Sequence, residues 1–416
     1  MDSVRRSVLD SGLRVVTEAL PELRSVTIGA WVGTGSRDET DVQSGASHFL
    51  EHLLFKGTPD RSAREIAEAV ESVGGEMNAF TGQEETVFYV RVPDAHVDLA
   101  VEILSDVLWR PAFRPDEVDS ERQVILEEIG MRDDTPDDLV HDLFAGALFP
   151  GHALGRSVLG TDSSIDAMPR DDIAAYHAAH YRPGNVVIAA AGNLDHDALV
   201  STLSSRAGPL DGDRPIRGAD GLGDASRIQV IERPTEQAHV VVGVRAIPHL
   251  DPDRYALTVV NQALGGGMSS RLFQEVREER GLAYSVYSYR AAFADTGMLA
   301  IYAGTSPERV HETLDVIDAE LDRLVTERGL PARELDAAKG HLKGSIAMSL
   351  ETSSSRMRRL GRAELIEGEI PSLDEIVGRI DAVSGDDVER VVERVIADRP
   401  RTLATVGPFS TSNFDR

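Results

Sequence analysis

The chain has 416 residues, and its 41% hydrophobic content is enough to build the cores of two or three domains. Its formal net charge of −27 argues against nucleic acid and anionic membranes as partners. It has no cysteine, which excludes disulfides and leaves His, Asp and Glu as the ligands of any metal site. No signal-peptide core and no apolar run of about 18 residues is present, so we expect a cytoplasmic protein that spans no membrane.

The first half of the chain opens with two strand-like runs and a helix that carries three polar side chains. The runs at 13–20 and 25–36 are rich in β-branched residues and end in Gly and Ser, which is typical of strands. The helix expected within 45–58 carries His48, Glu51 and His52. The elements expected after it are a helix at 62–75, strands at 76–83 and 85–92, helices at 95–109 and 115–148, a helix that ends at 181, and a buried strand at 185–193.

A segment dense in Gly, Pro, Asp and Ser separates this half from the next and predicts a linker at 209–225. We therefore expect an N-terminal domain at 1–208 and a C-terminal domain at 226–416. The elements expected in the second domain are strands at 227–234 and 238–247, helices at 255–267 and 270–281, strands at 283–293 and 297–305, and a helix at 310–325.

The order of elements in the second half repeats that of the first. In both halves a helix with a Gly stop is followed by two strands and a helix of similar length, which predicts a duplicated α/β unit. Where the first copy has SHFLEHLLFKG, the second has VVNQALGG. The His and Glu side chains of the first copy are therefore not needed for the fold, which favours a functional role for them.

The helix within 45–58 has the spacing of a zinc site. His48 and His52 are four residues apart and share one face of a helix, where two imidazoles can bind zinc and leave room for a third ligand and a water. Glu51 lies beside that face and is placed to act as a general base without being a ligand. The order H-x-x-E-H is the inverted form of a common zinc-protease motif, although such a pentapeptide also arises by chance in roughly a few per cent of similar chains.

Two glutamates of the long acidic helix are candidates for the missing ligand. Glu121 and Glu128 are seven residues apart, so they lie on one face of a helix. Val124 and Ile125 share that stripe and indicate that it points inward. Two buried carboxylates need a compensating cation, which zinc would supply. Glu127 is the rival, but it is rotated about 100° from Glu128 and suits solvent better.

These residues resemble the pitrilysin/insulinase family of zinc peptidases with the inverted motif. HFLEH followed by the glutamate of ERQVILEE carries the resemblance, together with GGGMSSRLFQEVREERGLAYSVYS in the second half. It covers nearly the whole chain and is closest to the half-length branch that includes the mitochondrial processing peptidase β subunit and its bacterial relatives. The implied fold is α/β (α+β), with two homologous domains that each pack a mostly antiparallel β-sheet with helices and together form half of a clam-shell chamber.

The resemblance also implies roles for individual residues. His48, His52 and Glu128 would bind one zinc ion, Glu51 would be the general base for a zinc-activated water, and Glu121 would support the site without binding metal. In the second half, Arg277 and Tyr284 match the family residues that contact the substrate and its carbonyl. The positions that match the edge strand to which a peptide adds by main-chain pairing are Asn78, Ala79, Phe80 and Thr81.

The resemblance finally implies an activity and an assembly. We expect a zinc metalloendopeptidase that hydrolyses peptide bonds in peptides or in unfolded, presequence-like segments. A chain with two such domains has to form a homodimer, or a heterodimer with a paralogue, to close the chamber, and Arg277 and Tyr284 would then serve the zinc site of the other subunit. The alternatives are a noncatalytic subunit or peptide-binding scaffold of a processing-peptidase-like complex, and a chamber that only holds unfolded segments.

A second histidine pair lies in AAYHAAHYRPGN. His177 and His180 are three residues apart and could imitate a ligand pair, but no third ligand stands near them in the sequence. We therefore interpret them as structural residues.

Overall fold

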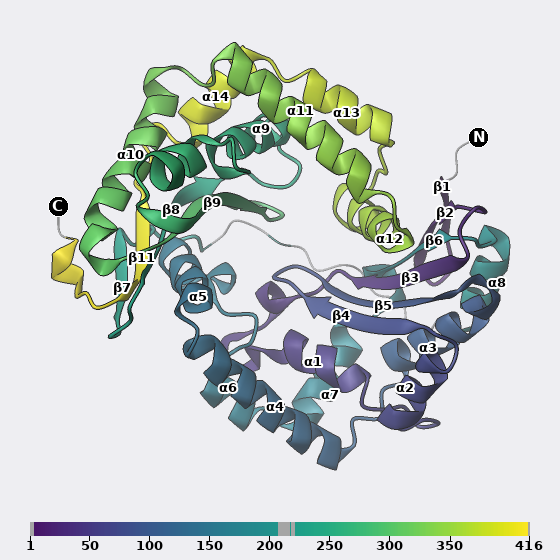
Figure 1. Ribbon diagram of the computed structural model, residues 1–416. Coiled ribbons are helices and arrows are strands. Elements are labelled where there is room, and N and C mark those ends of the chain that lie inside the picture. Colours follow the sequence, from purple (N-terminus) through teal and green to yellow (C-terminus); the bar gives the residue numbers. More distant parts are fainter. Residues whose placement is uncertain (1–3, 207–216, 218–220, 415–416) are drawn as a thin grey trace. The chain divides into compact units, whose positions relative to one another are not determined.

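The computed structural model describes residues 4–206, 217 and 221–414 (Figure 1). They form two compact units, and neither unit is a continuous half of the chain. The first unit comprises Met1–Gly130, Arg156–Ile216 and Ser349–Ile370, and the second comprises Met131–Gly155, Arg217–Met348 and Pro371–Arg416. The units thus differ from the expected domains 1–208 and 226–416 in two exchanged segments, because Met131–Gly155 belongs to the second unit and Ser349–Ile370 to the first. Of the expected linker 209–225, residues 209–216 and 218–220 lie outside the described residues.

The first unit is built on a six-stranded sheet in the order β1-β2-β6-β3-β5-β4. Neighbouring strands are antiparallel, except that β2 and β6 are parallel. Its strands are β1 (Val4–Val8), β2 (Arg14–Ala19), β3 (Ser25–Val32), β4 (Glu76–Thr81), β5 (Thr86–Pro93) and β6 (Val186–Gly192). Its helices are α1 (Ala46–Leu54), α2 (Ala63–Glu71), α3 (Val97–Trp109), α4 (Pro115–Asp133, which runs into the second unit), α6 (Asp162–Ala167), α7 (Arg170–His180), α8 (His196–Arg206) and α12 (Ser353–Arg362).

The second unit is built on a five-stranded sheet in the order β7-β11-β8-β10-β9. Here β7 and β11 are the parallel pair and the other pairs are antiparallel. Its strands are β7 (Ile228–Glu232), β8 (Ala238–Ala246), β9 (Ala283–Ala292), β10 (Gly297–Thr305) and β11 (Thr402–Gly407). Its helices are α5 (Pro136–Leu148), α9 (Arg254–Gly265), a π-helical turn at Phe273–Glu279, α10 (Val310–Thr326), α11 (Ala332–Ser349), α13 (Leu373–Asp381) and α14 (Gly385–Val395).

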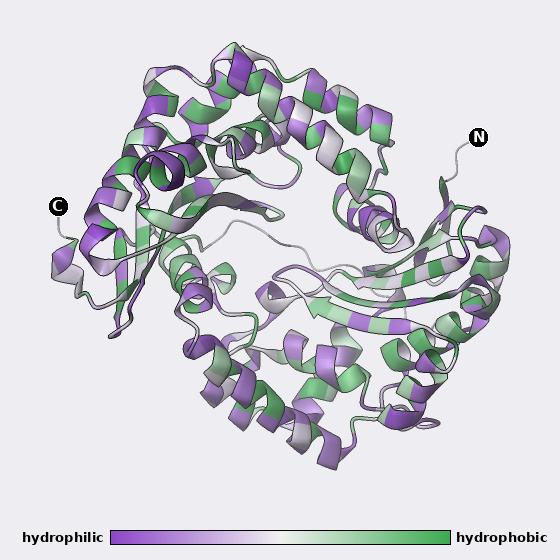
Figure 2. Ribbon diagram, in the orientation of Figure 1, coloured by the Kyte–Doolittle hydropathy of each residue, from purple (hydrophilic) through white to green (hydrophobic). Residues whose placement is uncertain are grey.

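The two sheets share one topology once β1 is set aside. In each, the strands taken in chain order lie as first, last, second, fourth and third, and the parallel pair joins the first strand to the last. This agreement confirms both the predicted duplication and the predicted mostly antiparallel sheets. Figure 2 shows hydrophobic residues along the strands of both units, and hydrophobic and hydrophilic residues alternating along α10 and α11. Among the described residues, no helix has the length and apolar character that crossing a membrane requires.

Each exchanged segment supplies a helix that covers an apolar face of the sheet in its unit. On one face of the first sheet, α1, α3 and α7 bury the core, and on the other face α12 packs over β6 and β3 (Figure 1). In the second sheet α5 covers β11 and β8 in the same way. An amphipathic helix does not encode which sheet it will cover, so the sequence could not assign α5 and α12 to their units.

A glycine in the central strand of each sheet allows the exchanged helix to approach closely. A Cβ at Gly29 of β3 would overlap the sulfur of Met357 on α12. Gly243 holds the corresponding place on β8, where a Cβ would come within 2.7 Å of the ring of Phe144 on α5. These contacts lie below the distance of ordinary carbon contacts, so a larger residue at either position would push the helix off the sheet.

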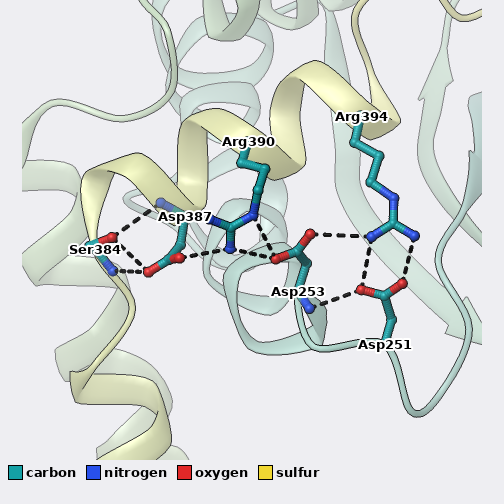
Figure 3. A network of polar contacts seen from close by, with 6 residues as sticks. All are labelled: Asp251, Asp253, Ser384, Asp387, Arg390 and Arg394. Atoms are coloured by element: carbon teal, nitrogen blue, oxygen red, sulfur yellow. Dashed lines mark hydrogen bonds and ion pairs between the residues drawn. The ribbon is translucent and has the colours of Figure 1, made fainter.

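An ion-pair network in the second unit joins α14 to the loop before α9 (Figure 3). Arg390 contacts Asp253 at 2.6 Å, and Arg394 contacts Asp251 at 2.7 Å and Asp253 at 3.2 Å. Asp387 extends the network because it contacts Arg390 at 2.7 Å. Both aspartates of the loop are buried, so the arginines compensate charge that would otherwise be costly to bury.

We expect the cover supplied by α12 to be essential for the stability of the first unit. Met357 is fully buried, and its sulfur accepts a hydrogen bond from the Trp31 indole at 3.3 Å. Met357→Ala should lower the free energy of unfolding by about 2–5 kcal/mol because it leaves a cavity. The denaturant midpoint of tryptophan fluorescence measures this, since Trp31 and Trp109, the two tryptophans, both lie in the first unit.

Met348→Ala is the matched control for this substitution, because Met348 is 67% exposed. It should change the free energy by no more than about 0.5 kcal/mol. Equal midpoints for the two variants would contradict the role assigned to α12.

Candidate metal centre

Gly45 and Glu39 fix the start of helix α1, which carries His48, Glu51 and His52. Gly45, just before the helix, has φ 93°, and a Cβ there would lie 2.6 Å from Ile165. The carboxylate of Glu39 accepts hydrogen bonds from the backbone N–H groups of Gly45 at 2.8 Å and Ser47 at 2.7 Å. A carboxylate at this end stabilises the helix by satisfying N–H groups that have no intrahelical partner.

The apolar face of α1 holds the helix against the core. Phe49, Leu50, Leu53 and Leu54 are at most 2% exposed. The two histidines of α1 point toward the glutamates of α4. The helix therefore has an anchoring face and a polar face.

The structure brings His48, His52 and Glu128 together. The Nε2 atoms of both histidines lie 3.6 Å from Oε2 of Glu128, and their rings are 4.7 Å apart, centre to centre. The three potential ligand atoms lie within 4.8 Å of one another, and no other group of three His, Asp or Glu among the described residues meets this closely. Burial, with a smaller contribution from the charge of His52, lowers the pKa of His48 to about 4, so at neutral pH its ring keeps a free lone pair.

These three side chains fit a zinc ion. Zn–N and Zn–O bonds of about 2.0–2.2 Å at tetrahedral angles place two ligand atoms about 3.4 Å apart. The two measured separations of 3.6 Å are close to that value. Two neutral imidazoles and one carboxylate also form the ligand set of known catalytic zinc sites, which keep a fourth position open.

Glu121 lies behind the cluster and contacts His52 on α1 and Lys56 just after it. One carboxylate oxygen accepts a hydrogen bond from Nδ1 of His52 at 3.0 Å, and the other lies 2.6 Å from Nζ of Lys56. Glu121 is thus placed to orient His52, not to join the three converging atoms. Ile125 is buried on the same helix, but Val124 is 38% exposed, so the predicted inward stripe was wrong at that position. Glu127 is exposed.

Glu51 is not part of the three-ligand group. Its Oε2 atom accepts a hydrogen bond of 2.6 Å from Oγ1 of Thr81, the last residue of β4. Burial raises the pKa of the Glu51 carboxyl, and the hydrogen bond from Thr81 opposes that shift. A raised pKa brings a carboxylate closer to the range in which a general base works at neutral pH.

The predicted substrate positions Asn78, Ala79, Phe80 and Thr81 lie on β4, at the edge of the first sheet. Ala79 packs on the core that contains α1, whereas Phe80 packs on the opposite face with Trp31. Side chains alternate along a strand, so Thr81 points to the same face as Ala79. This is the face on which Glu51 receives its hydrogen bond.

Arg277 and Tyr284 lie in the second unit. Arg277 belongs to the π-helical turn, and its guanidinium group lies over the ring of Tyr284, 4.5 Å from the ring centre, and over that of Phe273 at 4.7 Å. Tyr284, on β9, is 80% exposed. An exposed tyrosine next to a cation can donate a hydrogen bond to a bound molecule, but the predicted role of this pair in the metal centre stays a prediction.

The histidines of α7 are structural, as interpreted from the sequence. His177 is buried, and its Nε2 lies 2.8 Å from the carbonyl oxygen of Leu108, which anchors α7 to α3. The ring of His180 packs at 4.3 Å from that of Tyr176. Neither histidine belongs to a group of three possible metal ligands within the described ranges.

Sequence reasoning missed two residues that support α1. Glu39 caps its start and Lys56 binds Glu121 just beyond its end. The only signal for Lys56 was its rarity, since it is one of three lysines in an arginine-rich chain. No sequence pattern pointed to Glu39, because its contacts with Gly45 and Ser47 depend on how the preceding turns fold.

Known sequences match this chain over nearly its whole length. Residues 14–162 match the family described as Insulinase (Peptidase family M16), and residues 167–342 match the one described as Peptidase M16 inactive domain. The chain is 47% identical to an uncharacterized zinc protease of Streptomyces coelicolor, covering 100% of this chain and 92% of that protein. It is 39% identical to the uncharacterized zinc protease YmxG of Bacillus subtilis, covering 97% and 98%.

Solved structures share the fold at lower sequence identity. A protease from Helicobacter pylori has a TM-score of 0.90 at 23% identity and covers 98% of this chain and 100% of its own. A structure from Pseudomonas fluorescens described as a peptidase M16 inactive domain also has a TM-score of 0.90 at 23% identity, with 98% of both chains covered. With matching domains in both halves and relatives of 39–47% identity over nearly its full length, the chain belongs to the pitrilysin/insulinase family of peptidases, peptidase family M16.

Proposed function

We propose that the protein is a zinc metalloendopeptidase that hydrolyses peptide bonds in peptides or in unfolded, presequence-like segments. The observation that carries the proposal is the convergence of His48, His52 and Glu128 next to a carboxylate, Glu51, that is hydrogen-bonded to an edge strand. The names of the relatives, which are called zinc proteases, support the choice of metal. We propose one ion per chain, a number supported by the single cluster of possible ligands among the described residues.

In the proposed reaction the protein orients the peptide and moves the proton. A zinc ion held by these three ligands would polarise the scissile carbonyl and make an attacking water more acidic. Glu51 accepts the proton of that water and later donates it to the leaving amine. The hydrogen bond from Thr81 orients the Glu51 carboxylate for both steps.

In the proposed binding mode the peptide adds to β4 as an extra antiparallel or parallel strand. Within the described residues β4 pairs with β5 alone, so its other edge offers main-chain donors and acceptors. Main-chain pairing tolerates varied side chains and requires an extended substrate, which suits unfolded segments. Because Thr81 bonds to Glu51, a peptide paired along β4 is led to the general base.

The remaining part of the proposal is a dimer in which Arg277 and Tyr284 serve the metal centre of the partner subunit. The exposure of Tyr284 leaves its hydroxyl group accessible to a substrate carbonyl, where it could stabilise developing negative charge. No metal-ligand cluster is found in the described part of the second unit, in keeping with a supporting role. A noncatalytic scaffold is the alternative, and the description "inactive domain" applies to residues 167–342, which include none of the three proposed zinc ligands.

Zinc binding should depend on Glu128 and not on its neighbour. Glu128→Gln removes a charged ligand and should weaken zinc affinity by more than the roughly 10–100-fold that is typical of losing a supporting residue. Glu127→Gln is the matched control, since Glu127 is exposed and adjacent. Competition with a chromophoric chelator measures both affinities. Equal losses in the two variants would contradict the ligand assignment.

Glu51→Gln should separate zinc binding from catalysis. The variant should keep its zinc content and fold, while cleavage of a quenched fluorescent peptide falls by about 10²–10⁴-fold, because the general base is lost. Wild-type protein treated with a chelator should also lose cleavage and regain it with added zinc. Turnover by Glu51→Gln, or cleavage by the metal-free protein, would rule out the proposed reaction.

Mixed dimers test whether Tyr284 acts across subunits. Tyr284→Phe alone should lower kcat by about 10²–10³-fold, because a hydrogen-bond donor to the carbonyl is lost. Co-expression with Glu51→Gln should then restore about a quarter of the wild-type rate. Half of the dimers contain one subunit of each variant. In these dimers the intact Glu51 of one subunit meets the intact Tyr284 of the other, which completes one of the two sites. If Tyr284 serves its own chain, the co-expressed pair stays inactive.

A further inference from the structure

Lys56 is unusual among the cations of this chain. All but three of the 43 Lys and Arg residues are arginine. Lys56 lies just after α1, and its ammonium group reaches Oε1 of Glu121 at 2.6 Å. The side chain of Glu121 is 5% exposed and that of Lys56 is 34% exposed, so the carboxylate of this ion pair is shielded from water. Lys56 thus compensates the charge of a carboxylate that water hardly reaches.

Arginine is the partner of other buried glutamates of the first unit, including Glu84 and Glu364, whereas the carboxylate of Glu39 binds backbone N–H groups. Glu84 contacts Arg37 at 2.7 Å. Glu364 is held at both oxygens by Arg6, whose Nε and Nη2 atoms each donate a hydrogen bond of 2.9 Å. Arg6 shows how the fork of an arginine can engage both oxygens of a carboxylate with two parallel hydrogen bonds.

Glu121 requires a different partner because it has two tasks. Its Oε2 atom accepts the hydrogen bond from Nδ1 of His52, so only Oε1 is available to a cation. A lysine ammonium group is a compact point charge that can bind one oxygen and leave the other free. The fork of an arginine would compete with His52 for Oε2.

We infer that Lys56 is a positioning residue of the metal centre, acting through Glu121 on His52. Lys56 holds the carboxylate so that Oε2 faces Nδ1–H of His52, and this hydrogen bond directs Nε2 of the same ring toward Glu128. The inference rests on the proposed function in one respect, that His52 is a zinc ligand. A carboxylate bound to the far nitrogen of a ligating histidine fixes the ring and raises its basicity, and losing it costs about 10–100-fold in metal affinity.

Removal of the lysine charge leaves a buried carboxylate whose other described partner, the ring of His52, is neutral when it binds zinc. Such a group is costly to bury and moves toward water. Glu121 would then turn away from His52, and the ring would lose its orientation. Lys56→Met keeps most of the apolar stem and should lower zinc affinity by about 10–100-fold. It should also shift the visible absorption of the cobalt(II)-loaded protein, because that spectrum reports the geometry of the ligands.

Lys343 provides a closely matched control. Its ammonium group lies 2.6 Å from Asp381, and its side chain is 33% exposed, against 34% for Lys56. The carboxylate of Asp381 is 49% exposed. Lys343→Met thus removes an ion pair of the same length that touches no metal ligand, and it should leave zinc affinity and the cobalt spectrum unchanged.

A second comparison does not depend on the stability of the Lys56→Met single variant. In Glu121→Gln the buried charge is gone, so adding Lys56→Met should cause no further loss of zinc affinity. Competition of wild type and the four variants with a chromophoric chelator for zinc gives all the values. A further loss in the double variant, or normal affinity in Lys56→Met alone, overturns the inference. Wild-type protein that binds no zinc overturns the proposed function as well.

Discussion

The buried carboxylate of Glu121 joins the two helices that form the metal centre, and the rest of the site depends on it. Because the charge of Glu121 has to be compensated, the carboxylate binds His52 on one side and Lys56 on the other. Both partners belong to α1 or to the residues just after it, so α4 is held at a fixed register against α1. Glu128 lies two turns further along α4, and this register is what brings it to the two histidines.

Comparison of the two units shows that the fold does not require the metal-ligating side chains of α1. Both sheets have one topology, and each takes a covering helix from the other half of the chain, at a place where a central-strand glycine makes room for it. In the second unit α9 buries Val259, Val260 and Leu264 without any metal-ligating side chain among its twelve residues. An apolar helix face is enough to complete the fold, so the ligands of α1 are an addition to a shared scaffold.

The edge strand connects the scaffold to the chemistry. β4 lies at one end of the first sheet, and its last residue, Thr81, bonds to the one carboxylate of α1. A strand with an unpaired edge can pair with strands of other chains and cause aggregation unless it is short or covered. The six residues of β4 keep this edge short, while they offer enough main chain to align a peptide with the general base.

The sequence alone determined the faces of single helices and the order of elements. The fixed pitch of a helix places His48 with His52, and Glu121 with Glu128, whatever surrounds them, and the repeated order of strands and helices predicted the duplication. Tertiary structure decided which atoms meet. Spacing placed Glu121 and Glu128 on one face, but only packing assigned one to the ring nitrogen behind the site and the other to the cluster. Packing likewise brought Thr81 to Glu51, exposed Val124, and gave α5 and α12 to their sheets, because an amphipathic pattern records that a face is buried and not what buries it.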